Sequence, residues 1–504
     1  MVLIFPKLSS VDVRDASRVT DHPPLGILTI AATLLEWDYN PIIMDEQVEE
    51  DFYTKLNLAI SQKPICVGIS SMSGSHIKSA LKICEYIKSK SDIPIVLGGV
   101  HASLSPMSSI NNNLVDMIVV DDGEDSFRKL VKYLDTGGNL EEIEGIAYKQ
   151  DGKVNFNPPK PYDIEMIPKI PYYLVDLNKY SPGPLHFWTG KSTVLPMETS
   201  RGCPYNCSFC TESVRKKKWR ALSAERVIED IAFYKEKYGV TNFLLIDDNF
   251  FGDKKRAERI IDLMVSRNLN IKWYTNVRAD FLVKQGEEYL RKLEKAGCKM
   301  LTFGAESGTQ RIMDMIDKNG DIADLYKIDK MIKKTKIIPH FCTIRGFPTE
   351  KKEEVKNTYL FTLKLILTNN KACCDIPHLI PTPGTKICKE CLGAKAESYT
   401  LDDWEKAFEA DKLPDKPEWV LDETYKFMKD NEYCNRFISA ANRKELSPFS
   451  YLVFRMHLRL VIISLKLGFS KNISKIMKNY TAKLESKDVK HVDVNMQPKF
   501  QSAG

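Results

Sequence analysis

Short apolar runs alternate with amphipathic stretches through the first 150 residues. Five runs, at 2–5, 41–44, 65–69, 95–97 and 117–120, are apolar enough to form buried parallel strands. The stretches between them, at 25–36, 51–60, 75–88 and 125–134, repeat apolar residues with a helical spacing. Because strands that alternate with helices build parallel sheets with helices on both faces, the pattern predicts a doubly wound, Rossmann-like α/β domain over residues 1–145.

A second alternation covers residues 191–390. Strands are predicted at 194–198, 243–246, 272–277, 300–303, 337–344 and 375–380. Helices are predicted at 223–238, 254–267, 287–296, 310–317 and 351–367. This series is nearly six β/α pairs, so we expect a partial (β/α)6 TIM-type barrel, in which chemistry takes place at the carboxyl ends of the strands.

The two remaining segments carry weaker patterns. Residues 146–190 hold a hairpin-like alternation around Asp151-Gly152 and then many prolines, and we interpret them as a linker. Residues 391–504 predict a C-terminal helical region, with helices at 401–409, 422–439 and 449–467 and a disordered polar tail from residue 486.

The predicted helix at 449–467 is apolar but contains several basic residues. These charges argue against a simple membrane span. We expect the helix to pack on the barrel. Two alternatives stay open, namely contact with a membrane surface and binding of a lipid-like substrate.

Composition narrows the class of protein. A chain of 504 residues is expected to hold about two or three domains, and its net charge of +6 is too small to indicate nucleic-acid binding. Neither a signal peptide nor a membrane span is expected from the sequence. The twelve cysteines are scattered, and the loop described next needs reduced thiols, so we expect a cytoplasmic protein.

Three cysteines follow the first predicted barrel strand with the spacing C-x3-C-x2-C: Cys203, Cys207 and Cys210. Thiolates are the usual ligands of iron–sulfur clusters, and four of them complete the ligand set of a four-iron cluster. Three thiolates leave one iron with an open position, where chemistry can take place. The alternative is a zinc site with a fourth ligand elsewhere, although zinc sites normally use C-x2-C pairs.

With Phe209 just before its last cysteine, this loop resembles the signature of radical SAM enzymes. The resemblance implies a 4Fe–4S cluster whose open iron chelates the amino and carboxylate groups of S-adenosylmethionine (SAM). One electron then splits the sulfonium and yields a 5′-deoxyadenosyl radical. The resemblance also implies an electron donor, such as a flavodoxin or a ferredoxin.

The other barrel strands end in residues that resemble the SAM-binding elements of the same family. The candidates are Phe209, Asp247, Asp248, Arg278, Glu306, Ser307, Gly346 and Pro348. A carboxylate at 247 or 248 is expected to accept hydrogen bonds from the SAM ammonium, and Glu306 from the ribose hydroxyls. Arg278 is expected to neutralise the SAM carboxylate. The alternatives are helix capping for the two aspartates and a surface ion pair for Arg278.

Small and polar residues end the strands of the first domain and leave room for a large ligand. Pro24-Leu25-Gly26 opens the first helix, Gly98-Gly99-Val100-His101 follows the fourth strand, and Gly123-Glu124 follows the fifth. Each motif alone is typical of a tight turn, but together they resemble the cobalamin-binding domain that precedes the core of many radical SAM enzymes. The expected cobalamin-binding residues are Gly26, Ser70, Ser71, Gly98, Gly99, His101, Gly123 and Glu124.

Two further motifs fit known patterns less well. Some cobalamin proteins place a histidine on cobalt with D-x-H-x-x-G, but here Asp21-His22 directly precedes Pro23 and the spacing is wrong. We therefore expect cobalamin without a histidine from this motif, and His22 as a surface residue; cobalt ligation by His22 is the alternative. The pair Cys388 and Cys391, near Cys373-Cys374, is a weaker candidate for an auxiliary cluster.

The resemblance favours a methyltransferase that acts on an unactivated carbon of a small-molecule or lipid-like substrate. In that reaction one SAM methylates reduced cobalamin and a second supplies the radical that removes a hydrogen from the substrate, which then takes the methyl group. The same cofactors also fit a ring contraction or an oxidative cyclisation, and a third hypothesis is a cobalamin or SAM sensor without turnover. A methylthiotransferase is disfavoured because the first domain contains only Cys66 and Cys84, too few for a second cluster.

Overall fold

A computed structural model describes residues 1–7, 22–74, 76–180, 192–215, 218–409, 416–442 and 448–467. Its first unit is a seven-stranded sheet with the strand order β2-β1-β3-β4-β5-β6-β7. The five predicted parallel strands are β1 (Val2–Phe5), β2 (Ile42–Asp45), β3 (Val67–Ser70), β4 (Ile95–Gly98) and β5 (Met117–Val119). The helices between them are α1 (Leu25–Leu35), α2 (Phe52–Ser61), α3 (His76–Lys88), α4 (Val100–Leu104), α5 (Pro106–Ile110) and α6 (Gly123–Thr136).

The two faces of this sheet pack against different helices. Because side chains alternate along a strand, Leu3 faces α1 and α6, whereas Ile4 joins the apolar cluster of α2 and α3. This is the doubly wound arrangement that the alternation of strands and helices predicts, and it places the carboxyl ends of β1, β3, β4 and β5 along one edge.

The predicted hairpin extends the sheet and is not part of a linker. β6 (Ile146–Gln150) pairs antiparallel with β5, and β7 (Lys153–Asn157) pairs antiparallel with β6. Asp151 and Gly152 between them both have positive φ, 52° and 72°, as a two-residue hairpin turn requires. The sheet is therefore mixed, and it reaches residue 157, beyond the boundary of 145 that the sequence suggested. Residues 181–190 of the expected linker lie outside the described residues.

The second unit is a six-stranded parallel sheet in which each strand pairs with its neighbours in sequence order. Its strands are β8 (Val194–Met197), β11 (Asn242–Leu245), β12 (Lys272–Val277), β13 (Cys298–Glu306), β14 (Ile338–Thr343) and β15 (Cys373–Asp375). The helices that follow them are α8 (Ala224–Tyr238), α9 (Lys254–Ser266), α10 (Ala279–Lys295), α11 (Gln310–Met315), α12 (Ile322–Ile332) and α13 (Lys352–Thr368). The sequence pattern missed α12, and it placed the sixth strand at 375–380, whereas β15 ends at Asp375.

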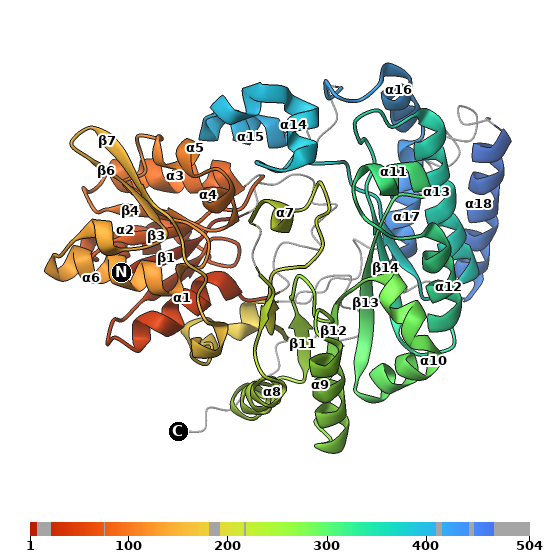
Figure 1. Cartoon of the computed structure of the whole chain (residues 1–504), viewed down its shortest axis with the longest axis horizontal. Helices are drawn as coiled ribbons and strands as arrows, with labels where there is room; N and C mark the ends of the chain where they lie inside the picture. The colour runs from red at the N-terminus through yellow and green to blue at the C-terminus, as the bar shows by residue number, and fades with distance from the viewer. Residues whose placement is uncertain are drawn as a thin grey trace.

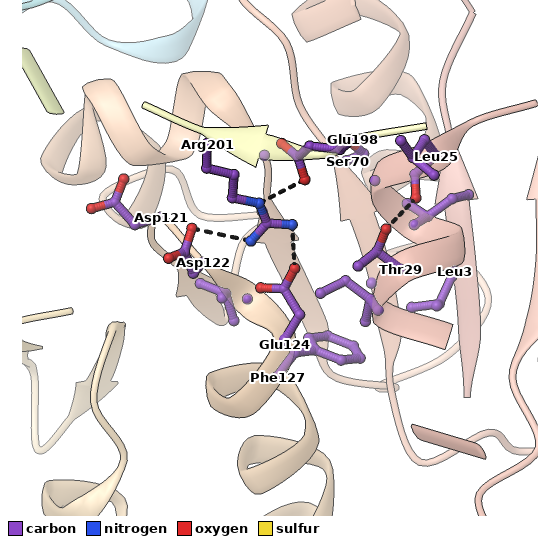
Figure 2. A pocket seen from close by; sticks show the side chains of 18 of the residues that line it. Leu3, Leu25, Thr29, Ser70, Asp121, Asp122, Glu124, Phe127, Glu198 and Arg201 are labelled. Carbon is purple, nitrogen blue, oxygen red and sulfur yellow. Dashed lines mark hydrogen bonds and ion pairs between the residues drawn. The ribbon is translucent and has the colours of Figure 1, made fainter. Parts of the chain in front are cut away.

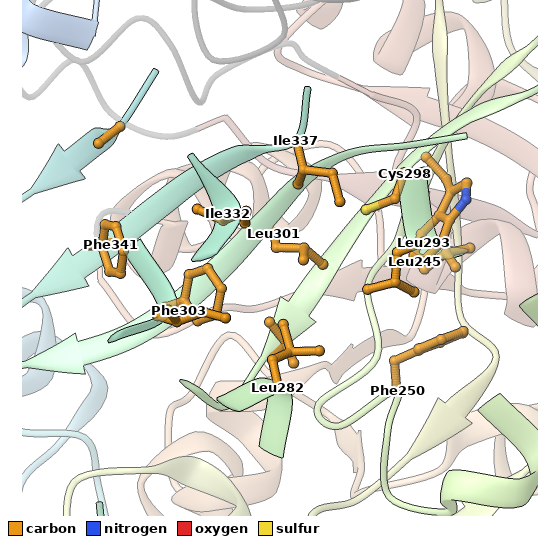
Figure 3. Packing of buried hydrophobic residues seen from close by; sticks show 14 of the residues in the cluster. Leu245, Phe250, Leu282, Leu293, Cys298, Leu301, Phe303, Ile332, Ile337 and Phe341 are labelled. Carbon is orange, nitrogen blue, oxygen red and sulfur yellow. The ribbon is translucent and has the colours of Figure 1, made fainter. Parts of the chain in front are cut away.

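A large apolar cluster lies between the barrel strands and their helices. Figure 3 shows Phe303 and Phe341 from the strands close to Leu282 and Ile332 from the helices. Alternate residues on the same strands therefore face the barrel interior.

The C-terminal region covers both units. α14 (Lys386–Leu392) and α15 (Leu401–Glu409) pack on the first unit, and α16 (Asp422–Asp430), α17 (Glu432–Asn442) and α18 (Pro448–Leu467) pack beside α13 and β15. Figure 1 shows α14 and α15 at the top, between the orange sheet unit and the green barrel.

The apolar helix α18 has one buried and one exposed side. Phe454, Leu458 and Val461 are buried in the large apolar cluster, so the helix packs on the barrel unit as expected. Met456 and Leu460 are exposed on the other side. No helix among the described residues combines the length and hydropathy needed to cross a membrane. The expected tail from residue 486 lies outside the described residues.

Candidate functional site

The cysteine loop leaves the end of the first barrel strand. It runs from β9 (Ser200–Arg201) to the short helix α7 (Thr211–Arg215). Burial raises the pKa of all three thiols, and that of Cys210 reaches about 11. Thiols in such surroundings ionise only beside a cation, and metal binding supplies one because it displaces the thiol proton. The donor set therefore fits an iron–sulfur cluster.

The three sulfurs are not gathered as tightly as a single zinc ion would hold them. Three thiolates on one tetrahedral zinc, each about 2.3 Å from the metal, lie only about 3.8 Å from one another. Cys203, Cys207 and Cys210 do not form a set of ligand atoms within 4.8 Å of one another. A four-iron cluster binds each thiolate through a different iron, which suits sulfurs that are farther apart.

Hydrogen bonds to neighbouring strand ends fix the loop. The N–H of Gly202 donates to Asp248 Oδ2 at 2.9 Å, and the N–H of Ser208 donates to the carbonyl of Ile316 at 2.9 Å. The Arg278 guanidinium lies 3.9 Å from the centre of the Tyr205 ring. The expected SAM residues Asp248 and Arg278 are thus brought to the loop. Phe209, another of them, is partly buried and packs against an apolar cluster that contains residues of both units.

Asp247 has a structural environment that the sequence did not reveal. It is fully buried, and its carboxylate accepts hydrogen bonds from the N–H of Thr199 at 2.6 Å and the hydroxyl of Ser200 at 2.9 Å. Burial raises the pKa of Asp247 and also that of Asp248, the latter to about 6. Asp247 therefore holds the segment before the loop, while Asp248 contacts the loop itself.

Glu306 and Ser307 lie at the end of β13, near the loop. Glu306 Oε1 accepts a hydrogen bond from Lys318 Nζ at 2.7 Å, and this buried pair acts electrostatically on Cys207. The hydroxyl of Ser307 accepts from the N–H of Thr309 at 3.1 Å and is buried. The structure thus brings Glu306 toward the loop, while Ser307 shapes the turn after it.

A buried carboxylate closes the turn that contains Gly346 and Pro348. Glu350 Oε2 accepts hydrogen bonds from the N–H groups of Gly346 and Phe347, at 2.6 and 3.1 Å. Gly346 has a φ of 82°, which favours glycine, and its carbonyl accepts from the Trp419 indole at 2.9 Å. The turn is therefore anchored from both sides, and burial raises the pKa of Glu350 to about 7.

Replacing Glu350 by glutamine is expected to remove a pH-dependent loss of stability. The pKa of Glu350 is higher in the folded chain than its ordinary value of 4.5. Between pH 4.5 and about 7 the unfolded chain therefore loses this proton while the folded chain keeps it, which lowers the free energy of unfolding by roughly 3 kcal/mol at most. Glu350→Gln keeps an acceptor for both N–H groups and cannot ionise. Denaturant unfolding of both proteins from pH 4.5 to 8 should show a smaller fall in stability for the variant; equal slopes would contradict this assignment.

A cavity of about 280 Å³ lies where the two units meet. It is lined by six of the eight expected cobalamin residues: Gly26, Ser70, Gly98, Gly99, Gly123 and Glu124. Barrel residues complete it, among them Glu198, Arg201 and Asp248. The cavity therefore joins the carboxyl edge of the first sheet to the base of the cysteine loop.

Ser71 and His101, the other two expected residues, do not line this cavity. His101 is fully buried, with its Nδ1 3.0 Å from the Ser73 hydroxyl, and burial lowers its pKa to about 4. Its N–H donates to the carbonyl of Ser71 at 2.9 Å, so both residues hold the β3 and β4 ends together. No histidine is among the described residues that line the cavity, and His22 is exposed on the segment before α1. Asp21 lies outside the described residues.

Arg201 ties the first unit to the loop, an interaction that the sequence did not predict. Its guanidinium contacts Glu124 at 2.6 Å, Glu198 at 2.6 Å and Asp122 at 3.3 Å, as Figure 2 shows. Arg201 is two residues from Cys203, so this buried cluster of charges positions the loop against the sheet edge.

The cavity holds one polar atom that needs a ligand. Glu124 Oε2 is buried and has no hydrogen-bond partner among the described residues. A buried acceptor without a partner costs about 1–3 kcal/mol, which a bound donor would recover. The glycines among its lining residues also leave room close to the backbone. The cavity thus fits one part of a large ligand with hydrogen-bond donors, such as cobalamin, whose remainder would lie outside it.

The second cysteine pair has a packing role. Cys388 and Cys391 are buried in the apolar cluster that α14 shares with the first unit. Cys373 and Cys374, on β15, belong to two other apolar clusters. The expectation of an auxiliary cluster from these four residues has no support in the structure.

Comparisons with known proteins match both units. Residues 197–362 match the Radical SAM superfamily, and residues 11–131 match the B12 binding domain. The chain is 31% identical to an uncharacterized methyltransferase of Pyrococcus horikoshii over 395 residues, 77% of this chain and 82% of that protein. It is 26% identical to the anaerobic magnesium-protoporphyrin IX monomethyl ester cyclase of Rubrivivax gelatinosus, over 75% of this chain and 68% of that protein.

Solved structures share the fold at low sequence identity. The radical S-adenosylmethionine methyltransferase TsrM from Kitasatospora setae, with cobalamin and a 4Fe–4S cluster bound, superimposes with a TM-score of 0.65 at 14% identity, over 93% of this chain and 99% of that one. The cobalamin-dependent S-adenosylmethionine radical enzyme OxsB gives a TM-score of 0.61 at 17% identity, over 92% and 71%. Both superpositions extend over the two units of this chain, so the similarity includes how the units are arranged.

Proposed function

Because the chain belongs to the cobalamin-dependent radical SAM enzymes, with a B12-binding domain ahead of a radical SAM core, we propose that it is a methyltransferase acting on an unactivated carbon. Its cofactors are a 4Fe–4S cluster with SAM, and cobalamin. When bound, these groups supply a 5′-deoxyadenosyl radical and a transferable methyl group.

One observation carries the proposal: the cavity at the sheet edge and the cysteine loop share residues. Asp248 lines the cavity and accepts the N–H of Gly202 in the loop, and Arg201 lines the cavity two residues before Cys203. A ligand in this cavity therefore lies beside the loop, which suits a reaction that needs both. Two similar proteins are methyltransferases by name, from Pyrococcus horikoshii and Streptomyces wedmorensis, the second 24% identical over 73% of this chain.

The chain's own residues contribute to such a reaction in three ways. The loop cysteines hold the cluster, and Asp247 and Asp248 hold the loop. Arg201 fixes the distance between the two units through buried ion pairs, in which removing one partner is costly, about 3–5 kcal/mol. The helices α14 and α15 pack in an apolar cluster with residues of both units and so help to hold the units together.

The similarity to a cyclase favours a second candidate with the same cofactors, an oxidative cyclisation. The two candidates differ in the fate of the SAM methyl group, and this difference can be measured before a substrate is known. In methyl transfer the group moves to cobalamin and leaves S-adenosylhomocysteine. A cyclisation consumes SAM only as the source of 5′-deoxyadenosine.

The test uses anaerobic protein with its cluster assembled, loaded with cobalamin, reduced, and given SAM with a trideuterated methyl group. We expect S-adenosylhomocysteine and trideuteromethyl-cobalamin, in amounts equal to the bound cobalamin, by mass spectrometry. Release of 5′-deoxyadenosine without labelled methylcobalamin would contradict the proposal and favour cyclisation. Formation of neither product under any reductant would favour a sensor without turnover.

A further inference from the structure

Three metal-binding side chains converge inside the barrel, on strands other than the one that leads into the cysteine loop. His340 and Cys342 belong to β14 and Asp375 to β15, and one ligand atom of each lies within 4.8 Å of the other two. His340 Nε2 is 2.7 Å from Asp375 Oδ2 and 3.8 Å from Cys342 Sγ. Within the described part of the chain, no other set of three or more such side chains comes this close together.

Strand geometry explains the convergence. His340 and Cys342 are two residues apart on β14, so their side chains share a face. The register pairs Cys342 with Asp375 on the neighbouring strand. Phe341 and Cys374, on the opposite face, lie in the apolar cluster against the helices. The three side chains therefore face the barrel interior.

The layer below this set is apolar and the side above it is open to water. Ile338 and Cys373, two residues before His340 and Asp375 on the same strands, form a small buried cluster with Met300 of β13. The side chain of His340 is 7% exposed, whereas that of Asp375 is 22% exposed and Cys342 is partly exposed. Among the described residues, the set is thus open to solvent on the side of Cys342 and Asp375.

We propose that His340, Cys342 and Asp375 bind a divalent ion of the zinc class, separate from the iron–sulfur cluster. Imidazole nitrogen, thiolate and carboxylate are the three ligand types of zinc, and three protein ligands with a fourth position open is the arrangement of reactive zinc sites. The fourth position faces the barrel interior. A water molecule, or an oxygen or nitrogen atom of a small molecule in the barrel, occupies it.

A hydrogen bond on the far side of the ring supports this assignment. His340 Nδ1 lies 3.3 Å from the Thr302 hydroxyl. Histidines that bind a metal through one nitrogen are normally fixed by a hydrogen bond from the other. Binding displaces the thiol proton of Cys342 to solvent and moves the ring proton to Nδ1, where it donates to Thr302. The contact between Nε2 and Asp375 widens by a few tenths of an ångström, and no electron is transferred.

The test measures zinc directly in the full chain with its cluster assembled. After dialysis against Zn²⁺, we expect one zinc per chain by mass spectrometry of the elements. X-ray absorption at the zinc edge should show one sulfur at about 2.3 Å and nitrogen or oxygen at about 2.0–2.2 Å. A chain in which Cys203, Cys207 and Cys210 are all alanine should keep this zinc, which separates the site from the loop.

Four single substitutions make the test specific. Cys342→Ser and Asp375→Asn should each lower zinc affinity by roughly 100-fold, and Thr302→Val by about 10–100-fold through the ring orientation. Cys298→Ser, which removes a buried thiol at the start of β13, should bind zinc as the wild type does. Zinc content equal in wild type and in both ligand variants, or a spectrum without sulfur, would overturn the proposal. Failure of methyl transfer would not affect it.

Discussion

Replacing Cys207 by alanine is expected to abolish both the iron–sulfur cluster and the release of 5′-deoxyadenosine. Cys207 is the most buried of the three loop cysteines, and Ser208 beside it is tied to Ile316 and Ile387 by backbone hydrogen bonds. A neighbouring residue has no thiolate to offer in its place. The rate of SAM cleavage under reductant should fall by roughly 10³-fold or more, which is about 4 kcal/mol of barrier.

Iron content, absorbance of the anaerobic protein and 5′-deoxyadenosine by mass spectrometry measure this effect. Cys66→Ala is the matched control, since it removes a fully buried thiol in the first unit, far along the chain from the loop. The control should keep its iron and its SAM cleavage. If Cys207→Ala retained a cluster and the wild-type rate, the cluster would have to be bound elsewhere, and the assignment of the loop would be wrong.

The parts of this fold that the sequence predicted are those set by local pattern. Strands and helices of the first unit follow from apolar spacing within each segment, and the spacing of Cys203, Cys207 and Cys210 is itself a local signal. The hairpin around Asp151-Gly152 was recognisable for the same reason. Its membership of the sheet was not, because that depends on pairing between Ile146 and Val119, 27 residues away in the chain.

The missed parts of the site depend on long-range contacts between charged residues. Arg201 and Glu124 are separated by 77 positions, and in the sequence each of them alone is typical of a charged surface residue. Glu124 was predicted as a cobalamin residue from a short motif, and the structure gives it two environments at once: one oxygen pairs with Arg201 and the other is buried beside the cavity. His101 was expected as a cobalamin residue from a short motif, but its burial depends on packing, which a motif does not encode.

The set of His340, Cys342 and Asp375 shows the same difference between local pattern and long-range contact. A strand at 338–343 places residues 340 and 342 on one face, and this much follows from sequence. The position of Asp375 follows only from the register of β14 with β15, and the sequence pattern placed that sixth strand too late. A ligand set drawn from two strands therefore stays invisible until their pairing is known.

Replacing Gly26 by leucine is expected to abolish cobalamin binding without loss of stability. Gly26 lies in the first turn of α1 and lines the cavity, and a Cβ built on it meets nothing within 4 Å. A leucine side chain there would occupy space that the cofactor needs. Glycine within a helix costs about 0.5–1 kcal/mol relative to alanine, so the variant should be at least as stable as the wild type. Equilibrium dialysis should show at least a roughly 100-fold weaker affinity, about 2.7 kcal/mol.

Two further glycine variants make this result interpretable. Gly26→Ala adds one methyl group to the open space and should keep most of the affinity. Gly99→Ala should lose both affinity and stability, because Gly99 has φ 92° and ψ −171° and a Cβ there would lie 2.8 Å from the Ser71 carbonyl oxygen. That conformation costs a residue other than glycine about 1–3 kcal/mol. Wild-type cobalamin affinity in Gly26→Leu would mean that the cofactor does not occupy this cavity, since a filled cavity cannot also hold the ligand.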